Sequence, residues 1–317
     1  MTSQQLKSDP TVLALQKIQQ SLGLRDIPFA NQLRLDIHGA NWGKILAGTY
    51  DGQFKKVLIK LQVALADYEH GSSGETEEGI VVLDHVRQTL DSVDIAFAAT
   101  DEHRLAILSG VKGSGKSRTL QLAHTKHKGH LISARPSWSG AYLNFLNRFA
   151  AGMNLPESRS AGAAECVIID SMVESKGLIC LDEFNYFSSN ALAFVKTLIN
   201  ETRWVVLGST IPHHLHRMAS DRQTSQESAQ LLRRAVAITT IPSVTVRTIE
   251  HIRRALYPDV TVGVYAEMMA TVCNRHKHID SICQILADTD PADSSDLPKS
   301  IARHERFAST IVKSSDL

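Results

Sequence analysis

The sequence predicts an α/β protein in which helices cover both faces of a parallel five-stranded sheet, with helical segments at either end. Two observations support this fold class. From residue 80 onward, short and fully apolar runs alternate with segments of helical periodicity, which is typical of buried parallel strands joined by helices. Before that point the apolar residues recur at helical spacing, as in Val12, Leu15 and Ile18.

Four segments are expected along the 317 residues. Residues 1–68 form a helical domain, and residues 69–79, which are small, acidic and without apolar side chains, form a flexible linker. Residues 80–243 form the α/β domain, and residues 244–317 form a mainly helical lid and tail. The expected strands of the α/β domain are 105–108, 130–134, 178–181, 204–207 and 236–241, and its expected helices are 80–99, 117–127, 139–153, 163–174 and 191–199.

The charge balance excludes a global electrostatic attraction to nucleic acid or membrane, because the formal net charge is only +1. Any surface for such a partner must therefore be a local patch. The four cysteines form no CxxC pair, no secretory signal is visible, and no apolar stretch approaches the length of a membrane-spanning helix. We therefore expect a cytoplasmic protein without a membrane partner.

A phosphate-binding loop is predicted at residues 110–117, which match the pattern G-x-x-x-x-G-K-[ST] in full. The loop follows an apolar strand and opens a helix, so its backbone N–H groups and the helix N-terminus would surround phosphate oxygens. The expected cofactors are ATP and Mg²⁺, with Lys116 on the β and γ phosphates and Ser117 on the metal. The expected nucleotide contacts are Gly110, Val111, Lys112, Gly113, Ser114, Gly115, Lys116, Ser117 and Arg118. The alternative is a chance turn rich in Gly, Ser and Lys.

Two carboxylates complete the predicted site. The apolar run at 178–181 ends in Asp182 and Glu183. Asp182 is expected to hold Mg²⁺, and Glu183 is expected to polarise the attacking water as the catalytic base. The alternative is a solvated pair at a strand end, which the upstream phosphate loop makes the weaker interpretation.

The order of these motifs resembles that of the AAA+ ATPases, and among them the ATPases that assist DNA transposition. The resemblance is to the phage Mu transposition protein B and, more distantly, to IstB-like helper ATPases. It extends over most of the chain and includes Pro136-Ser137, Leu181-Asp-Glu183, Leu207-Gly-Ser209 and Leu231-Leu-Arg-Arg234.

This resemblance implies two further catalytic residues. Ser209 would be sensor 1, the residue that orients the water, and Thr210 is the alternative. Either residue could instead be an N-cap of the segment that follows. Arg234 would be the arginine finger that reaches a neighbouring subunit's γ-phosphate, with Arg233 as the alternative. The Mu-type protein has Asn at sensor 1 and Ser-Arg-Ile around its arginine, so this chain departs from that pattern at Ser209 and at Arg233-Arg234-Ala235. For sensor 2 the basic candidates are Arg275 and Lys277, neither in a Gly-Ala-Arg context.

The N-terminal segment has the proportions of a helix-turn-helix, with helices at 27–35 and 40–48 and a turn at 36–39. The Mu-type protein has a similar domain, and its Gly-Thr-Tyr-x-Gly turn resembles residues 48–52 here. The expected DNA contacts are Asn41, Trp42, Lys44, Lys55 and Lys56. The alternative is a small docking domain with Trp42 in its core.

The resemblance implies an ATPase that forms a ring or filament on double-stranded DNA, without strong sequence preference, and activates a transposase or integrase-like partner. Such a protein would be associated with the nucleoid. Residues 213–257, with seven arginines and three acids, could follow the duplex or face a neighbouring subunit. Two other functions remain open: an ATP-gated transcription regulator or replication loader, and a signalling or defence ATPase whose N-terminal domain binds protein.

One group of residues has the composition of a zinc site, namely Cys273, His276, His278 and Cys283. Its spacing fits no finger or ribbon pattern, so buried cysteines with exposed histidines are the favoured interpretation.

Overall fold

The computed structural model describes residues 2–33, 35, 37–71, 76–77, 80–136, 142–220, 226–276, 278–293 and 295–315. The chain divides into two compact units. One unit is Asp84–Pro242, and the other comprises Met1–Leu83 together with Ser243–Leu317. The four-segment division expected from the sequence stays a prediction, since this grouping places both ends of the chain in one unit.

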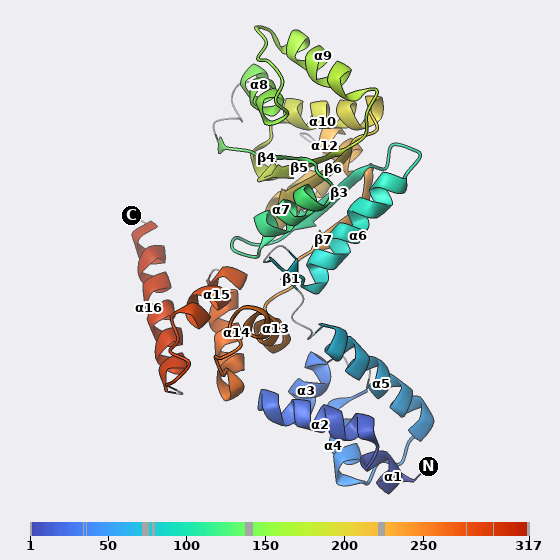
Figure 1. Cartoon of the computed structure of the whole chain (residues 1–317), viewed down its shortest axis with the longest axis vertical. Helices are drawn as coiled ribbons and strands as arrows, with labels where there is room; N and C mark the ends of the chain where they lie inside the picture. Colours follow the sequence, from blue (N-terminus) through green and yellow to red (C-terminus); the bar gives the residue numbers. More distant parts are fainter. Residues whose placement is uncertain are drawn as a thin grey trace. The chain divides into compact units, whose positions relative to one another are not determined.

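The unit Asp84–Pro242 contains the predicted parallel sheet (Figure 1). Its five strands follow the order β4-β5-β6-β3-β7, and all neighbouring strands are parallel. Strands β3, β5 and β6 are fully buried, which explains why their sequences are continuous apolar runs. The strands are β3 (Leu105–Ser109), β4 (His130–Ser133), β5 (Leu178–Asp182), β6 (Val205–Thr210) and β7 (Ala235–Thr240).

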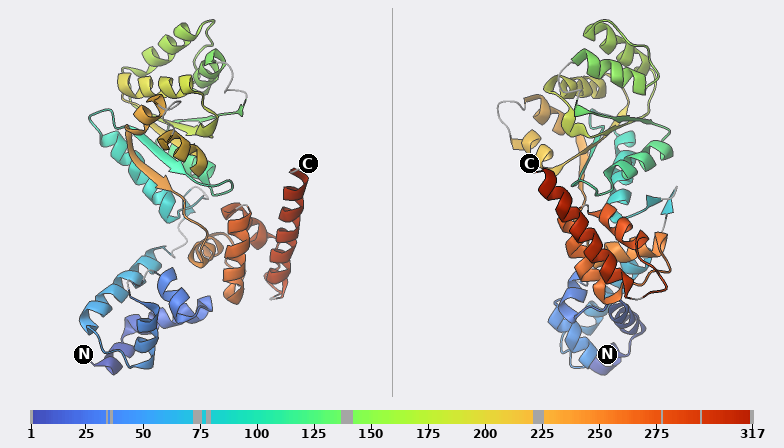
Figure 2. Two further views of the ribbon diagram at one scale, coloured as in Figure 1. Left: turned by 180° about the vertical axis from the view of Figure 1, so that it is seen from behind. Right: turned by 90° about the vertical axis from the view of Figure 1, so that its left-hand side faces the viewer.

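Helices cover both faces of this sheet (Figure 2). Helices α6 and α7 contact one face, and α8 contacts β4 and, with α9 and α10, belongs to the core on the other face. Helix α6 begins at Asp84, not at residue 80 as expected, because Ile80–Val81 forms a short strand. The helices are α6 (Asp84–Ala98), α7 (Lys116–Lys126), α8 (Tyr142–Gly152), α9 (Ala161–Met172), η2 (Phe184–Tyr186), α10 (Ser189–Glu201), α11 (Pro212–Ser220) and α12 (Gln226–Leu232).

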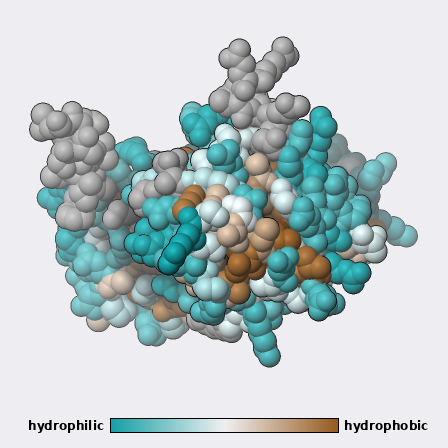
Figure 3. Space-filling view, turned by 90° about the horizontal axis from the view of Figure 1, so that it is seen from above, coloured by the Kyte–Doolittle hydropathy of each residue, from teal (hydrophilic) through white to brown (hydrophobic). Residues whose placement is uncertain are grey.

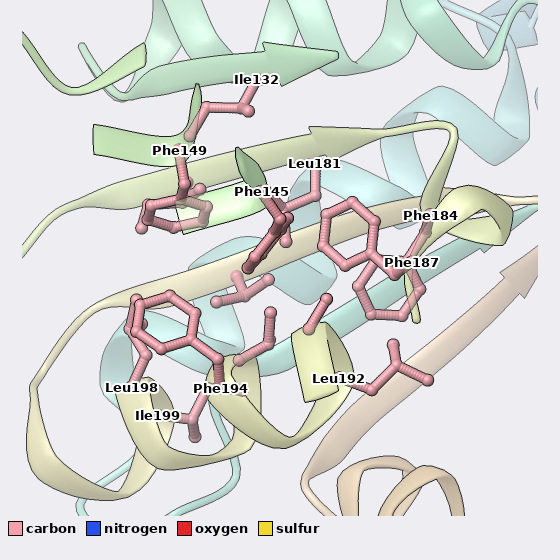
Figure 4. Close-up of a cluster of buried hydrophobic side chains, with 14 of the residues drawn as sticks. Ile132, Phe145, Phe149, Leu181, Phe184, Phe187, Leu192, Phe194, Leu198 and Ile199 are labelled. Atoms are coloured by element: carbon pink, nitrogen blue, oxygen red, sulfur yellow. The ribbon is translucent and has the colours of Figure 1, made fainter. Parts of the chain in front are cut away.

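An aromatic core joins the sheet to α8 and α10 (Figure 4). Phe194 of α10 meets Phe145 and Phe149 of α8 edge-on, with ring centroids 6.0 and 5.4 Å apart. All three side chains are almost completely buried. Such pairs add about 1 kcal/mol each beyond the burial of apolar area, so this core fixes the carboxyl ends of β4 and β5.

The second unit is helical apart from one small hairpin (β1, Thr76–Glu77; β2, Ile80–Val81). Its N-terminal helices are α1 (Ser3–Lys7), α2 (Pro10–Leu22), α3 (Asp26–Gln32), α4 (Gly39–Ala47) and α5 (Phe54–Gly71). Its C-terminal helices are α13 (Val246–Leu256), η3 (Gly263–Tyr265), α14 (Ala266–Arg275), α15 (Ile279–Ala287) and α16 (Asp296–Ser315). Helix α5 extends into the segment that the sequence predicts to be a linker.

The molecular surface is mainly hydrophilic on the face drawn in Figure 3, with a smaller hydrophobic area near its middle. Over the described part of the chain, no helix is both long enough and apolar enough to cross a membrane.

Candidate nucleotide site

The loop between β3 and α7 has the backbone that a phosphate-binding loop requires. Gly113 and Gly115 adopt φ angles of 75° and 87°, in the left-handed region that favours glycine. A Cβ at Gly110 would lie 2.5 Å from Ser114 Oγ and 2.9 Å from Ile241 Cδ1, so no side chain fits there. The glycines of the motif are therefore explained by backbone conformation and by close packing.

Lys116 lies in the first turn of α7 and is 6% exposed. Its Nζ donates to the carbonyl oxygens of Gly110 and Val111, at 2.9 and 3.0 Å. The ammonium group is thereby held over the loop, at the position from which it would reach a phosphate.

Two buried hydroxyl groups, one at the end of β3 and one in the loop, are left without partners in the part of the chain that the structure describes. Ser109 and Ser114 are 1% and 0% exposed, and neither Oγ has a hydrogen-bond partner among the described residues. Buried polar groups rarely stay unpaired, and a phosphate oxygen would satisfy such donors. The side chains of Val111, Lys112, Ser117 and Arg118 are exposed around this loop, as expected for residues at its rim.

Asp182, at the end of β5, is the centre of a hydrogen-bond network beside the loop. Ser117 Oγ donates to its Oδ2 at 2.6 Å, and Ser209 Oγ donates to its Oδ1 at 2.5 Å. Asp182 is 7% exposed, and the described residues supply its carboxyl group with hydroxyl and N–H donors but no ion pair. A buried carboxylate needs a compensating charge, and Mg²⁺ binds through few protein oxygens, so these groups fit that ion.

Glu183 has an unusual backbone conformation at the same place, with φ 57° and ψ 45°. Its N–H donates to Asp182 Oδ1 at 3.0 Å and to Ser209 Oγ at 3.3 Å. A residue other than glycine in this region costs roughly 1–3 kcal/mol and often marks a functional position. The network therefore fixes the backbone from which the Glu183 carboxylate projects.

The structure distinguishes the two sensor 1 candidates. Ser209 contacts Asp182, whereas Thr210 Oγ1 lies 2.9 Å from Nδ1 of buried His214. Neither Ser209 nor Thr210 is the N-cap of α11, because this helix begins at Pro212, two residues after Thr210. The geometry therefore brings Ser209 to the predicted site, and its catalytic role stays a prediction.

His214, which the motif analysis does not single out, stabilises the tip of β6. Burial, followed by the positive charges of Arg217 and His213, lowers the pKa of His214 to about 4. The imidazole is therefore neutral at pH 7. Gly110 N donates to the carbonyl of Thr210 at 3.1 Å, so the Thr210–His214 pair adjoins the phosphate loop. In the sequence, the contact between these two side chains is indicated only by the four-residue separation of Thr210 and His214.

Cys180 lies inside β5, two residues before Asp182. Burial, with a smaller contribution from the charge of Asp182, raises the pKa of the Cys180 thiol to about 12. The thiol therefore stays protonated at neutral pH.

The two arginines before β7 differ in their surroundings. The Arg234 guanidinium donates to Asn200 Oδ1 and Gln230 O, both at 2.7 Å, and to Glu102 Oε2 at 3.2 Å. Its side chain is 12% exposed, whereas Arg233 is exposed. This geometry favours Arg233, the alternative, over Arg234 for contact with another subunit. The assignment of an arginine finger stays a prediction.

The predicted DNA contacts on the N-terminal helices are only partly accessible. Trp42 is 0% exposed, and its Nε1 donates to Gln19 Oε1 at 2.8 Å. The expectation that Trp42 approaches a groove is therefore wrong, and the alternative position in the core is correct. Lys44, Lys55 and Lys56 are exposed, and Asn41 is half-buried.

The helix-turn-helix itself stays a prediction, although α3 and α4 contact each other closely. A Cβ at Gly39 would lie 2.5 Å from Cα of Ile27, so only glycine allows this crossing. Asp36 in the predicted turn lies outside the described residues.

The remaining candidates receive less support. No group of three or more potential metal ligands was found among the described residues, which leaves the zinc interpretation without support. His278 is buried, against the expectation that the histidines would be exposed. Arg275 pairs with Glu305 at 2.6 Å, and Lys277 lies outside the described residues, as does Ser137 of the resemblance.

Comparison with known proteins supports the fold. No family model matches the sequence, and no curated protein was found to match it. Among solved structures, Cdc6p of Pyrobaculum aerophilum is similar with a TM-score of 0.50 and 13% identity, over 70% of this chain and 65% of that one. A Walker-type ATPase of Pyrococcus abyssi is similar with the same TM-score and identity, over 73% of both chains.

The chain thus spans slightly less than two thirds of the Cdc6p chain. At 13% identity these similarities concern the arrangement of the backbone only. Together with the parallel sheet and the loop between β3 and α7, they show that the chain has an α/β P-loop fold like that of these two structures.

Proposed function

We propose that the chain binds ATP with Mg²⁺ at the β3–α7 loop and hydrolyses the γ-phosphate. The observation that carries this proposal is the attachment of Ser117 and Ser209 to the two oxygens of the Asp182 carboxylate. Ser117 lies in the first turn of the helix that follows the phosphate loop, and Ser209 lies near the end of the neighbouring strand, so the network joins phosphate binding to catalysis.

Each group has a distinct task in the proposed reaction. Lys116 and the loop N–H groups would bind the phosphates, and Ser117 and Asp182 would hold Mg²⁺, which would supply positive charge beside the phosphates. Glu183 accepts a proton from the attacking water, and the Ser209 hydroxyl keeps the Glu183 backbone in place by accepting a hydrogen bond from the Glu183 N–H.

We further propose that the ATP-bound chain assembles on double-stranded DNA and activates a transposase or integrase-like partner. The resemblance to transposition ATPases supports this proposal, as do the exposed Lys44, Lys55 and Lys56. Contact of these lysines with DNA phosphates is part of the proposal, and it makes the proposed binding dependent on salt.

The position of the arginines supports assembly. Leu105 N, at the start of β3, donates to Arg234 O, so both arginines lie at the amino edge of the sheet. The phosphate loop follows the other end of β3, roughly 16 Å away for five residues. An arginine at this edge therefore cannot serve its own subunit's phosphate loop and is suited to a neighbour's.

The direct test combines ATP turnover with electron microscopy of the protein on duplex DNA. We expect rings or filaments with ATP and DNA, none with ADP, and faster hydrolysis per subunit when DNA is added. If ATP is hydrolysed but no DNA-bound assembly forms, the assignment as an ATPase stands. The proposed DNA function is then rejected in favour of a protein target. Stimulation of strand transfer by the integrase-like partner would test the last step.

A further inference from the structure

A pocket of about 310 Å³ lies beside β4 and α8, in the same unit as the phosphate loop. Its size falls at the lower end of the range for small-ligand sites. The residues lining it include Leu131, Ser133 and Arg135 from β4 and its continuation, and Asn144, Arg148 and Gly152 from α8. None of these residues is a functional candidate in the sequence motifs.

The fold builds this pocket at the edge of the sheet. Ile132 and Ala134 face the core, so the alternating residues Leu131, Ser133 and Arg135 are exposed. Strand β4 is an edge strand, and Ala134 N donates to Asp182 O of its single neighbour. The N–H group of Ser133 consequently points to the free edge of the sheet.

Helix α8 forms the other wall at close range. A Cβ at Gly152 would lie 2.8 Å from Cγ1 of Ile132. The end of α8 can therefore approach β4 this closely only because residue 152 is glycine. Arg148 lies one turn earlier on α8 and is exposed, as is Asn144 one further turn back. The helix thus presents a guanidinium and an amide beside the exposed edge of β4.

The described residues that line this pocket carry two positive charges and no negative one. Neither Arg135 nor Arg148 forms an ion pair or a side-chain hydrogen bond with the described residues. Residues 103–156 contain eight Lys or Arg and no Asp or Glu at all. The other 26 of the 34 basic residues share the rest of the chain with all 33 acidic ones, so positive charge is concentrated in this segment.

The phosphate loop accounts for only part of this concentration. Lys116 serves the loop, Arg104 donates to the carbonyls of Ile199 and Thr202, and Lys126 pairs with Asp94. Arg135 and Arg148 have no such structural use. Two guanidinium groups that the described residues leave unpaired, beside a hydroxyl, an amide and the edge N–H of Ser133, are suited to a phosphate oxyanion, which arginine binds with two parallel hydrogen bonds.

We propose that this β4–α8 pocket binds a phosphate group, supplied by a nucleic-acid backbone. The source of the phosphate rests on the proposed DNA function, whereas the oxyanion chemistry of the pocket does not. The ATPase unit thereby holds DNA directly, in addition to any contact made by the N-terminal helices. The contact is made to the backbone and carries no base preference.

The test is the salt dependence of duplex binding by the full chain, loaded with a non-hydrolysable ATP analogue. The double variant Arg135→Gln/Arg148→Gln is compared with Lys176→Gln/Arg203→Gln, which removes the same charge from two exposed positions outside the pocket. We expect the pocket variant to bind at least about fivefold more weakly, and its log–log salt slope to fall by about 0.9 for each DNA phosphate that it no longer neutralises. Nucleotide titration should give the parent affinity for both variants, which shows that they are folded.

An equal loss of affinity in the two double variants, or a parent slope in the pocket variant, overturns the proposal. Titration of inorganic pyrophosphate into Lys116→Ala, with and without the pocket substitutions, separates the sources. Pyrophosphate binding that needs Arg135 and Arg148, in a protein that binds no DNA, retains the oxyanion site and rejects both the nucleic-acid source and the proposed DNA function. If polyglutamate displaces the duplex from the pocket and pyrophosphate does not, the pocket is assigned to an acidic protein instead.

Discussion

Ser209 and Asp182 are joined by a 2.5 Å hydrogen bond between neighbouring strands of the sheet. The N–H of Glu183 donates to both partners, so these three residues form one unit at the carboxyl ends of β5 and β6. Ser117 occupies the other Asp182 oxygen. Hydrolysis should therefore depend on Ser209 more strongly than nucleotide binding does.

Ser209→Ala tests this dependence. The variant should bind ATP like the parent, while kcat falls by about tenfold to a hundredfold because Glu183 loses one of its two anchors. Ser209→Thr keeps the hydroxyl group and should recover part of the rate. Steady-state kinetics with a separate binding titration checks both variants, and an unchanged kcat in Ser209→Ala would remove Ser209 from the catalytic unit.

Glu183→Gln should separate binding from hydrolysis. The amide cannot accept the proton of the attacking water, so turnover should fall by about a hundredfold or more while ATP and Mg²⁺ still bind. DNA-bound assemblies should then persist longer in the presence of ATP. Parent-like hydrolysis in this variant would show that Glu183 is not the base.

Arg233→Ala and Arg234→Ala should differ in kind. Arg234 holds Asn200, Gln230 and Glu102, so its loss should lower the free energy of unfolding by about 2 kcal/mol. Arg233 is exposed, so its loss should change stability by no more than about 0.5 kcal/mol. If Arg233 serves a neighbour's site, Arg233→Ala should bind ATP and lose hydrolysis. Chemical denaturation and ATPase assays measure the two effects.

Mixing variants tests whether the active site is shared. Arg233→Ala mixed with Lys116→Ala should recover activity, because one subunit supplies an intact pocket and the other an intact arginine. Mixed oligomers that form but show no recovery would leave Arg233 without this role. Recovery with Arg234→Ala in its place would assign the role to Arg234, as the resemblance implies.

His214 should make stability depend on pH. Its pKa is about 4 in the folded protein and near 6.5 when unfolded, so the unfolded chain binds more protons between these values. The stability it contributes is complete above pH 6.5 and is lost as pH falls towards 4. Between pH 7 and 5 the parent should lose about 2 kcal/mol more than His214→Asn.

The control for this prediction is His216→Asn, which removes an exposed histidine two residues away that is not among the groups lowering the pKa of His214. Urea unfolding at both pH values should give this variant the parent's pH dependence. A parent-like dependence in His214→Asn would show that His214 does not titrate in this range.

The sequence predicts the sheet closely because its strands are buried on both faces, which leaves short apolar runs such as 105–108 and 178–181. The structure also brings Ser117, Asp182 and Ser209 together, since parallel strands bring their carboxyl ends to one edge, and the catalytic roles of these residues stay predictions. Helix α6 begins four residues later than expected, because Ile80 and Val81 form a strand. The apolar character of these two residues is compatible with a strand as well as with a helix.

Contacts between distant residues are harder to predict. Trp42 is buried because Gln19, on another helix, accepts its N–H, and local charge gives no sign of that contact. Arg234 resembles a surface arginine in the sequence, yet residues at positions 102 and 200 engage it. Tertiary partners of this kind are set by packing, and they decide which of two adjacent arginines is accessible.

The central claim is that the β3–α7 loop binds the phosphates of ATP, and titration of a fluorescent ATP analogue into Lys116→Ala tests it most directly. Lys116 supplies the charge held over the loop, so this variant should bind at least about a hundredfold more weakly than the parent. Lys176→Ala, which removes an exposed lysine elsewhere on the same unit, should bind like the parent. Equal affinities in all three proteins would contradict the assignment of the nucleotide site.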